Sequence, residues 1–219
     1  MAKGKLIVIE SGTDGSGKST QFDLLYDRLK NEGHNVIKVK FPDYESDSSA
    51  LVRMYLKGEF GENPKGINLY AASTFYAVDR FASYQQKWKK LHDEGAIILA
   101  DRYTTSNMIH QASKIDSTSK KKEYLEWLSD LEFNKFKLPE PDLVIFLDMP
   151  VEYSVKFIEE RGNQDIHEND LDYLQSTYNN AVEIADIYNW QEIKCTVGAM
   201  IKTIDQIHQE VYEQVNKIL

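Results

Sequence analysis

Residues 12–20 read Gly12-Thr13-Asp14-Gly15-Ser16-Gly17-Lys18-Ser19-Thr20, directly after the apolar run Leu6–Ile9. The run has the character of a strand, and the residues that follow the loop have the apolar spacing of a helix. Strand, glycine loop and helix start form the context in which G-x-x-x-x-G-K-[ST] binds phosphate. The glycines let backbone N–H groups converge on phosphate oxygens, and a helix N-terminus attracts anions. We therefore predict that residues 12–20 bind a nucleoside triphosphate, with an ordinary glycine-rich turn as the alternative.

The composition is that of a globular chain. The 219 residues are 42% hydrophobic, and 26 basic against 35 acidic residues give a net charge of −9. This charge argues against a general nucleic-acid binder, whose affinity depends on neutralising phosphates. The single cysteine, Cys195, excludes an intramolecular disulfide. No apolar stretch approaches the roughly 20 residues of a membrane helix, and no signal peptide is apparent. We therefore expect a cytoplasmic protein without membrane or nucleic-acid partners.

Short apolar runs alternate with longer helical patterns along the whole chain. This alternation is typical of βαβ units and a parallel sheet. We expect strands at Leu6–Ile9, Val36–Phe41, Ala96–Ala100, Leu143–Leu147 and Glu192–Thr196. We expect helices at about 18–32, 48–57, 67–94, 121–135, 150–160, 168–188 and 203–218. The pattern indicates one doubly wound α/β domain over residues 1–219, with its ligands at the carboxyl ends of the strands.

Polar side chains follow several of these strands. Asp101 and Arg102 end the third strand, where a carboxylate can hold Mg²⁺ through water and an arginine can grip phosphate. A simple ion pair closing the strand is the alternative. Tyr76 and Arg80 lie four residues apart and share one helix face, which suits either base binding or surface packing. Asp148 ends the fourth strand, and we favour a structural role for it over a metal-binding one.

The segment 159–168 joins two expected helices with charged residues, glycine and amides. Such a segment is typical of a lid that closes over a triphosphate and excludes water, although a solvated connection has the same composition. The five histidines show no metal-ligand spacing, so we expect no zinc site.

Together these motifs resemble the thymidylate kinase family, P-loop enzymes that phosphorylate dTMP to dTDP with ATP and Mg²⁺. The similarity runs from about Lys5 to the last expected helix. It rests on Asp14 in the loop, Phe41-Pro42, Phe75-Tyr76 with Arg80, and Asp101-Arg102-Tyr103 with Ser106-Asn107. The resemblance implies a five-stranded parallel sheet in the order 2-3-1-4-5, helices on both faces, and a lid at about residues 161–170.

The resemblance also assigns residues to the dTMP site. It implies that Asp14 contacts the sugar 3′-hydroxyl, that Tyr76 stacks on thymine, and that Arg80 reaches a base carbonyl. His110 falls where many members carry an aromatic residue that crowds out a ribose 2′-hydroxyl. The other acceptor positions that it implies are Phe41, Asn107 and Gln111.

At the phosphate end, the resemblance implies that Arg102 binds the acceptor phosphate and that Asp101 lies near the metal. Lys18 would reach the β- and γ-phosphates of ATP, and the Ser19 hydroxyl would ligate Mg²⁺. Arg161 matches an arginine beside the lid that packs near adenine. We take Lys18, Asp101, Arg102 and Arg161 as the candidate catalytic residues.

Three features depart from the family pattern. Glu10-Ser11-Gly12 stands where members usually read Glu-Gly, and the apparent extra residue predicts that Glu10 is shifted outward. Tyr44 takes the place of an arginine that commonly grips the dTMP phosphate after Phe41-Pro42. The lid offers only Arg161 and His167 as basic residues, although phosphoryl transfer depends on positioned positive charge.

Arg53 is the one guanidinium in the helix expected after Tyr44. We predict that it binds the acceptor phosphate with Arg102, since arginine grips phosphate with two parallel hydrogen bonds. A surface arginine is the alternative. A kinase of another deoxynucleotide or deoxynucleoside, and a catalytically weak nucleotide-binding homologue, remain open beside dTMP kinase. The family's habit of dimerising favours a homodimer.

Overall fold

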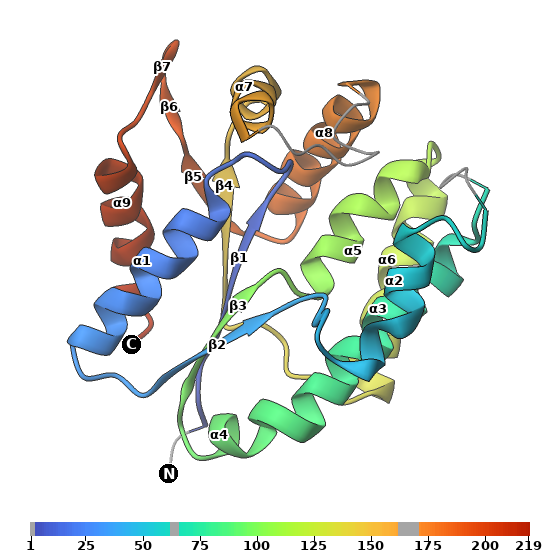
Figure 1. Cartoon of the computed structure of the whole chain (residues 1–219), viewed down its shortest axis with the longest axis horizontal. Helices are drawn as coiled ribbons and strands as arrows, with labels where there is room; N and C mark the ends of the chain where they lie inside the picture. Colours follow the sequence, from blue (N-terminus) through green and yellow to red (C-terminus); the bar gives the residue numbers. More distant parts are fainter. Residues whose placement is uncertain (1–2, 62–65, 162–170) are drawn as a thin grey trace.

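The computed structural model describes residues 3–61, 66–161 and 171–219. Its centre is a parallel sheet of five strands in the order β2-β3-β1-β4-β5 (Figure 1). The strands are β1 (Leu6–Ser11), β2 (Val36–Lys40), β3 (Ile97–Asp101), β4 (Leu143–Asp148) and β5 (Gln191–Lys194). This is the predicted strand order. The inner strands are buried along nearly their whole length because helices cover both faces of the sheet.

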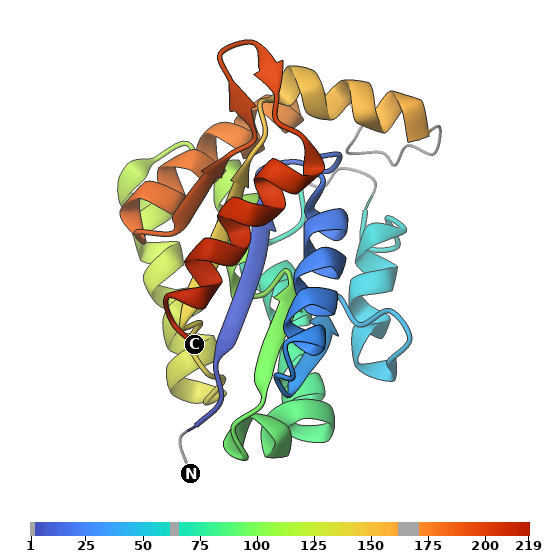
Figure 2. The same ribbon diagram turned by 90° about the vertical axis from the view of Figure 1, so that its left-hand side faces the viewer.

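Two layers of helices bury the faces of this sheet. On one face lie α1 (Lys18–Asn31) and α9 (Ile204–Asn216), which run side by side in Figure 2. Leu25 and Val211 of these helices meet strand residues such as Ile9 in one apolar cluster. The other face is covered by the segment Tyr84–Trp88, α4 (Lys89–Asp93), α5 (Thr104–His110) and α8 (Leu171–Ile187), and α3 (Leu69–Ser83) packs against α5. The peripheral helices are α2 (Ala50–Leu56), α6 (Thr118–Ser129) and α7 (Val151–Arg161).

The expected helices are confirmed, with local changes of winding. The helix expected at 67–94 is α3 and α4, which a π-helical segment, Tyr84–Trp88, joins into one body. A second π-helical segment, Asp130–Lys135, extends α6, and a 3₁₀ turn at Asp47–Ser49 precedes α2.

Helix α5, the 3₁₀ turn Ala112–Lys114 that follows it, and a short hairpin were not predicted. Helix α5 has the sequence TTSNMIH, which combines β-branched and polar residues of low helix propensity. Tertiary contacts stabilise it instead, because the Asn180 amide of α8 donates to the carbonyls of Met108 and Ile109 at 3.1 and 2.6 Å. The hairpin is antiparallel and is formed by β6 (Thr196–Val197) and β7 (Met200–Ile201). It is tied to α7 where the Tyr153 hydroxyl donates to the carbonyl of Ala199 at 2.8 Å.

The prediction that Glu10 is shifted outward was wrong. β1 continues to Ser11, and the alternation of a strand turns Glu10 away from the α1 layer and toward α5. Its carboxylate is fully buried and accepts hydrogen bonds from Thr105 Oγ1 at 2.9 Å and Ser106 Oγ at 2.5 Å. The hydroxyls of α5 therefore satisfy a carboxylate that the apolar interior would otherwise exclude.

Candidate active site

The glycine loop connects β1 to α1 at the carboxyl ends of the strands, where ligands bind in doubly wound sheets (Figure 1). Gly15 and Gly17 have φ angles of 74° and 80°, in the left-handed region that glycine adopts readily. A Cβ on Gly15 would lie 2.6 Å from the carbonyl oxygen of Ser154 in α7. Thr13 Oγ1 also donates to Ser154 Oγ at 2.8 Å. The loop is thus fixed in place by α7, as a preformed anion site requires.

Lys18, the first residue of α1, is buried at the end of this loop. Its Nζ donates to Asp101 Oδ1, and Lys40 Nζ lies 3.6 Å from the other oxygen of that carboxylate. Burial lowers the pKa of Lys18, the neighbouring Arg102 lowers it further, and Asp101 opposes both. An anionic ligand would therefore favour the charged form of this lysine.

Two cavities meet at the loop. The first has a volume of about 370 Å³ and the second of about 430 Å³, and Asp14, Lys18 and Ser19 line both. The first contains most of the predicted acceptor residues: Asp14, Phe41, Tyr76, Arg80, Arg102, Asn107 and His110. The second contains loop residues from Gly15 onward and an apolar wall: Gly15, Ser16, Gly17, Thr20, Met149, Phe157, Ile201, Ile204 and Ile207. We name them the acceptor cavity and the donor cavity. Gly12 and Thr13 line the acceptor cavity.

Arg102, directly after β3, links the glycine loop to α5. Its Nη2 donates to Asp14 Oδ1 at 2.6 Å, and its Nη1 lies 3.0 Å from His110 Nε2. Because arginine can only donate, His110 Nε2 accepts this bond and carries no proton. The proton of the neutral ring is then on Nδ1, which faces the Tyr173 hydroxyl at 3.4 Å. The guanidinium of Arg102, which we predict to bind the acceptor phosphate, is therefore oriented by Asp14 on one side and by His110 on the other.

Arg80 is buried behind the opposite end of the acceptor cavity. Its Nε and Nη2 donate to the two carboxylate oxygens of Glu132 at 2.6 and 2.5 Å, and Nη1 donates to the carbonyl of Tyr103 at 3.3 Å. Thr104 Oγ1 donates to the same carboxylate at 2.8 Å. This two-pronged ion pair fixes the plane of the guanidinium. Nη1 carries a second N–H, which suits the predicted contact with a base carbonyl.

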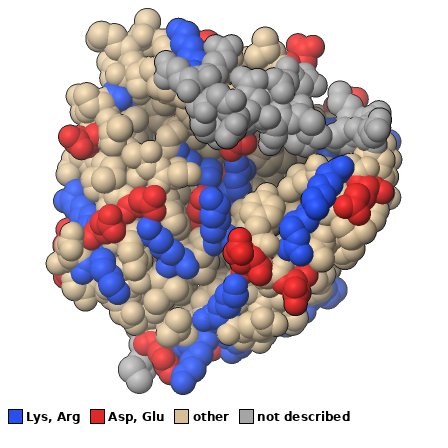
Figure 3. Space-filling view, in the orientation of Figure 1, with Lys and Arg blue, Asp and Glu red and all other residues tan. Residues whose placement is uncertain are grey.

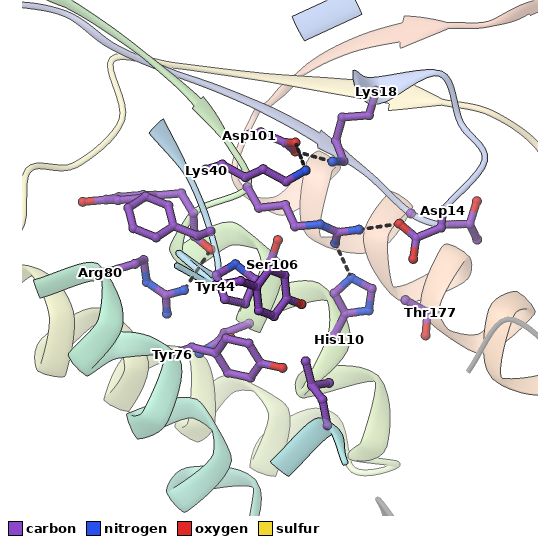
Figure 4. Close-up of a pocket in the computed structure, with 18 of the residues that line it drawn as sticks. Asp14, Lys18, Lys40, Tyr44, Tyr76, Arg80, Asp101, Ser106, His110 and Thr177 are labelled. Atoms are coloured by element: carbon purple, nitrogen blue, oxygen red, sulfur yellow. Dashed lines mark hydrogen bonds and ion pairs between the residues drawn. The ribbon is translucent and has the colours of Figure 1, made fainter. Parts of the chain in front are cut away.

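Tyr76 lies beside Arg80 on α3, as the predicted helix spacing requires. Its ring meets Tyr55 edge-on, with centroids 6.3 Å apart. Figure 4 shows Tyr76 and Arg80 on one side of the acceptor cavity, with Lys18, Asp101 and Asp14 on the other. The acceptor cavity thus has an end with Tyr76 and Arg80, which we call the base end, and an end with Lys18, Asp101 and Asp14, which we call the phosphate end.

Arg53 was expected to bind the acceptor phosphate, but the contacts of its Nη1 lie in the turn that follows β2. It is absent from the residues that line the acceptor cavity. Its Nη1, which has only two N–H groups, is shared among the carbonyls of Tyr44 and Ser46 and the Ser49 hydroxyl, at 3.0, 2.9 and 2.6 Å. Arg53 therefore holds together the turn that follows β2.

Gln111 was also expected in the acceptor cavity, but it does not line it. Its side chain is buried, and Oε1 accepts a hydrogen bond from Lys114 Nζ at 2.9 Å. Asp148 accepts a hydrogen bond from the Tyr178 hydroxyl of α8 at 2.7 Å, and its structural role stays a prediction. The lid residues 162–170 and the side chain of Arg161 lie outside the described part of the structure.

The sequence did not single out several residues that line the acceptor cavity: Lys40, Tyr55, Lys114, Tyr173 and Thr177. Lys40 could have been noted, because it directly precedes Phe41-Pro42 at a strand end. The others come from separate helices and turns, and only the tertiary fold brings them to one cavity.

Known proteins provide an independent comparison. A family model described as thymidylate kinase matches residues 9–211. The chain belongs to the thymidylate kinase family. A probable thymidylate kinase of Thermococcus onnurineus is 32% identical over 208 residues, which cover 94% of each protein. One of Pyrococcus abyssi is 29% identical over 210 residues, 95% of this chain and 94% of that protein.

A solved thymidylate kinase structure from Candida albicans matches with a TM-score of 0.74 and 25% identity. The match covers 99% of this chain and 93% of that one. Membership of the family makes this chain an ATP-dependent phosphotransferase.

The Arg80–Glu132 pair leads to a first prediction for this thymidylate kinase family member. Glu132→Ala leaves a buried guanidinium without its partner, so we expect the free energy of unfolding to fall by about 3–5 kcal/mol. Urea denaturation measures this change. Glu94→Ala is the control, because it breaks the exposed pair with Lys90 and should change the free energy by less than about 1 kcal/mol. Similar losses in both variants would contradict the energetic importance of the buried pair.

Proposed function

We propose that the chain transfers the γ-phosphate of ATP to dTMP and so produces dTDP. Membership of the thymidylate kinase family supports this reaction. The observation that carries it is the pair of cavities that meet at Asp14, Lys18 and Ser19. A triphosphate in the donor cavity and a monophosphate in the acceptor cavity would bring their phosphates together at these three residues.

Phosphoryl transfer depends on positioning and on stabilising negative charge, and the phosphate end provides groups for both. We assign Lys18 to the transferring phosphoryl group and Arg102 to the acceptor phosphate. Asp14, now paired with Arg102, would accept a hydrogen bond from the sugar 3′-hydroxyl. His110 orients Arg102 and stands beside the sugar.

At the base end, Tyr76 would stack on thymine, while the second N–H of Arg80 Nη1 donates to a base carbonyl. Phe41 and Asn107 complete this wall, and Asn107 Nδ2 is itself held by the carbonyl of Ser73 at 3.2 Å. Fixed N–H donors of this kind discriminate between bases, because a base without acceptors at the right positions would leave these donors without a hydrogen bond.

The donor cavity suits ATP. The backbone N–H groups of residues 12–20 would surround the phosphates, and the helix N-terminus of α1 adds to the positive potential. Phe157, Ile201 and Ile204 give an apolar wall for the base. Arg161, at the end of α7, remains our candidate for a contact with adenine.

The residues present fit Mg²⁺ as a cofactor. The Ser19 hydroxyl and the Asp101 carboxylate both line the acceptor cavity, and such oxygen donors are the ligands that Mg²⁺ prefers. Bound Mg²⁺ would neutralise charge on the phosphates. In the described parts of the chain, no group of three or more His, Cys, Asp or Glu side chains is placed to hold a metal ion. Few protein ligands are expected for Mg²⁺, because phosphate oxygens and water supply the rest.

A second candidate acceptor is another deoxynucleotide or a deoxynucleoside. Tyr44 lines the acceptor cavity where family members commonly carry an arginine, and His110 replaces an aromatic residue. The Candida albicans thymidylate kinase is described as having broad substrate specificity. The small number of basic residues expected in the lid keeps a catalytically weak homologue as a further alternative, which an assay of turnover decides.

A panel of dTMP, dUMP, dGMP and thymidine with ATP and Mg²⁺ tests the function. We expect the highest kcat/KM for dTMP. Lys18→Ala is the control for chemistry, because it removes the charge aimed at the transferring group and should lower turnover at least ~10²-fold. Far-UV circular dichroism of the same sample checks that the variant is folded. A wild-type rate for dTMP no higher than that of the variant would contradict the proposal.

Tyr76→Ala tests the base site. We expect dTMP binding to weaken by roughly 1–3 kcal/mol through lost stacking, while the affinity for a non-hydrolysable ATP analogue stays unchanged. Titration calorimetry with each ligand measures both affinities. If the two ligands lost affinity equally, Tyr76 would be a structural residue rather than a base ligand.

We also propose that the protein is a homodimer. Leu51, Val78 and Phe81 on α2 and α3 are exposed by 37–42%, and Val78 and Phe81 share one helix face. Sedimentation equilibrium should give twice the mass of the chain for the wild type, and Val78→Glu should shift it toward the monomer. A monomeric wild type would contradict the dimer.

Nothing in the described ranges is a helix both long enough and apolar enough to cross a bilayer. The cytoplasmic location and the absence of a nucleic-acid partner stay predictions.

A further inference from the structure

The acceptor cavity needs more positive charge at its phosphate end than the assigned residues provide. A nucleoside monophosphate carries close to two negative charges at neutral pH. Lys18 belongs equally to the donor cavity, and Arg80 is neutralised by Glu132 at the base end. Lys114 is bonded to the Tyr55 hydroxyl and to Gln111, each at 2.9 Å. Of the described basic residues that line this cavity, Arg102 and Lys40 remain for the phosphate.

Lys40 is well placed for this task. It is the last residue of β2 and pairs in register with Asp101 on the neighbouring strand, so its backbone stands beside the phosphate end. The following residue is fixed as well, because the Phe41 N–H donates to the carbonyl of Asp101 at 3.0 Å. In Figure 4 the Lys40 side chain points at Asp101, close to Lys18.

The Lys40 ammonium is held only loosely by its present partner. Its Nζ lies 3.6 Å from Asp101 Oδ2, longer than a good hydrogen bond, and the side chain is 65% exposed. A flexible four-carbon stem then lets the charge turn from Asp101 to a bound anion. Figure 3 shows basic side chains in the middle of the face seen in Figure 1, with acidic side chains beside them.

We propose that Lys40 binds the acceptor phosphate together with Arg102, in place of the arginine that Tyr44 replaces. The inference rests on the proposed function, since it takes dTMP as the acceptor. Arg53, the other candidate for this role, is engaged by the turn that follows β2.

Titration calorimetry with dTMP and with thymidine tests the proposal, because only dTMP carries the phosphate. Lys40→Met keeps the length of the stem and removes the charge, so dTMP should bind roughly 10- to 100-fold more weakly, while thymidine binds as to the wild type. Lys40→Arg should retain most of the dTMP affinity.

Lys38→Met is the matched control. Lys38 lies two residues earlier on the same strand and pairs with Asp23 at 2.5 Å, outside the acceptor cavity. This variant should bind both ligands as the wild type does. Thermal unfolding of this variant also shows how much the stability of the protein changes when a lysine of β2 is replaced by methionine.

Unchanged dTMP binding by Lys40→Met would overturn the proposal, and so would equal losses for dTMP and thymidine, which indicate general damage to the cavity. A different result would contradict the proposed function, namely a wild-type protein that does not phosphorylate dTMP. If wild-type turnover is normal and Lys40→Met binds dTMP normally, only the role of Lys40 is wrong.

Discussion

The Asp101 carboxylate is the charge around which the phosphate end is arranged. It ends β3 and is buried, and it contacts Lys18 from the glycine loop and Lys40 from β2. A buried carboxylate is stable only when it is paired, so Asp101 holds Lys18 firmly, and Lys40 more loosely, at the carboxyl edge of the sheet before any substrate arrives. In the free protein it offsets the positive charge of these two lysines.

Two further buried carboxylates support the acceptor cavity from behind. Glu132 holds Arg80 at the base end, and Glu10 holds Ser106, which lines the cavity. Neither carboxylate lines the cavity. The groups that face the ligand are therefore oriented by partners in the protein interior, which lowers the reorganisation needed when a nucleotide binds.

The sequence predicted what depends on local pattern or on the family resemblance. The glycine loop follows from nine consecutive residues, and the pairing of Tyr76 with Arg80 on one face follows from helical spacing. Contacts between distant segments were not predictable. Glu132 lies 52 residues from Arg80, and α5 is held by Asn180 rather than by its own propensity. The hydrogen bonds of Arg53 to Tyr44 and Ser46 were not predictable either, because they depend on the folded turn.

Arg102 occupies a backbone conformation that suits glycine better. Its φ angle is 69°, and a residue with a side chain in this region costs of order 1–3 kcal/mol. The chain keeps an arginine there, paired with Asp14 and His110, at a strand end where glycine would relax the backbone. A glycine would relax the backbone but would lose both contacts of the guanidinium. In the acceptor site that we propose, the strain at Arg102 is thus a cost in stability set against the binding of a phosphate.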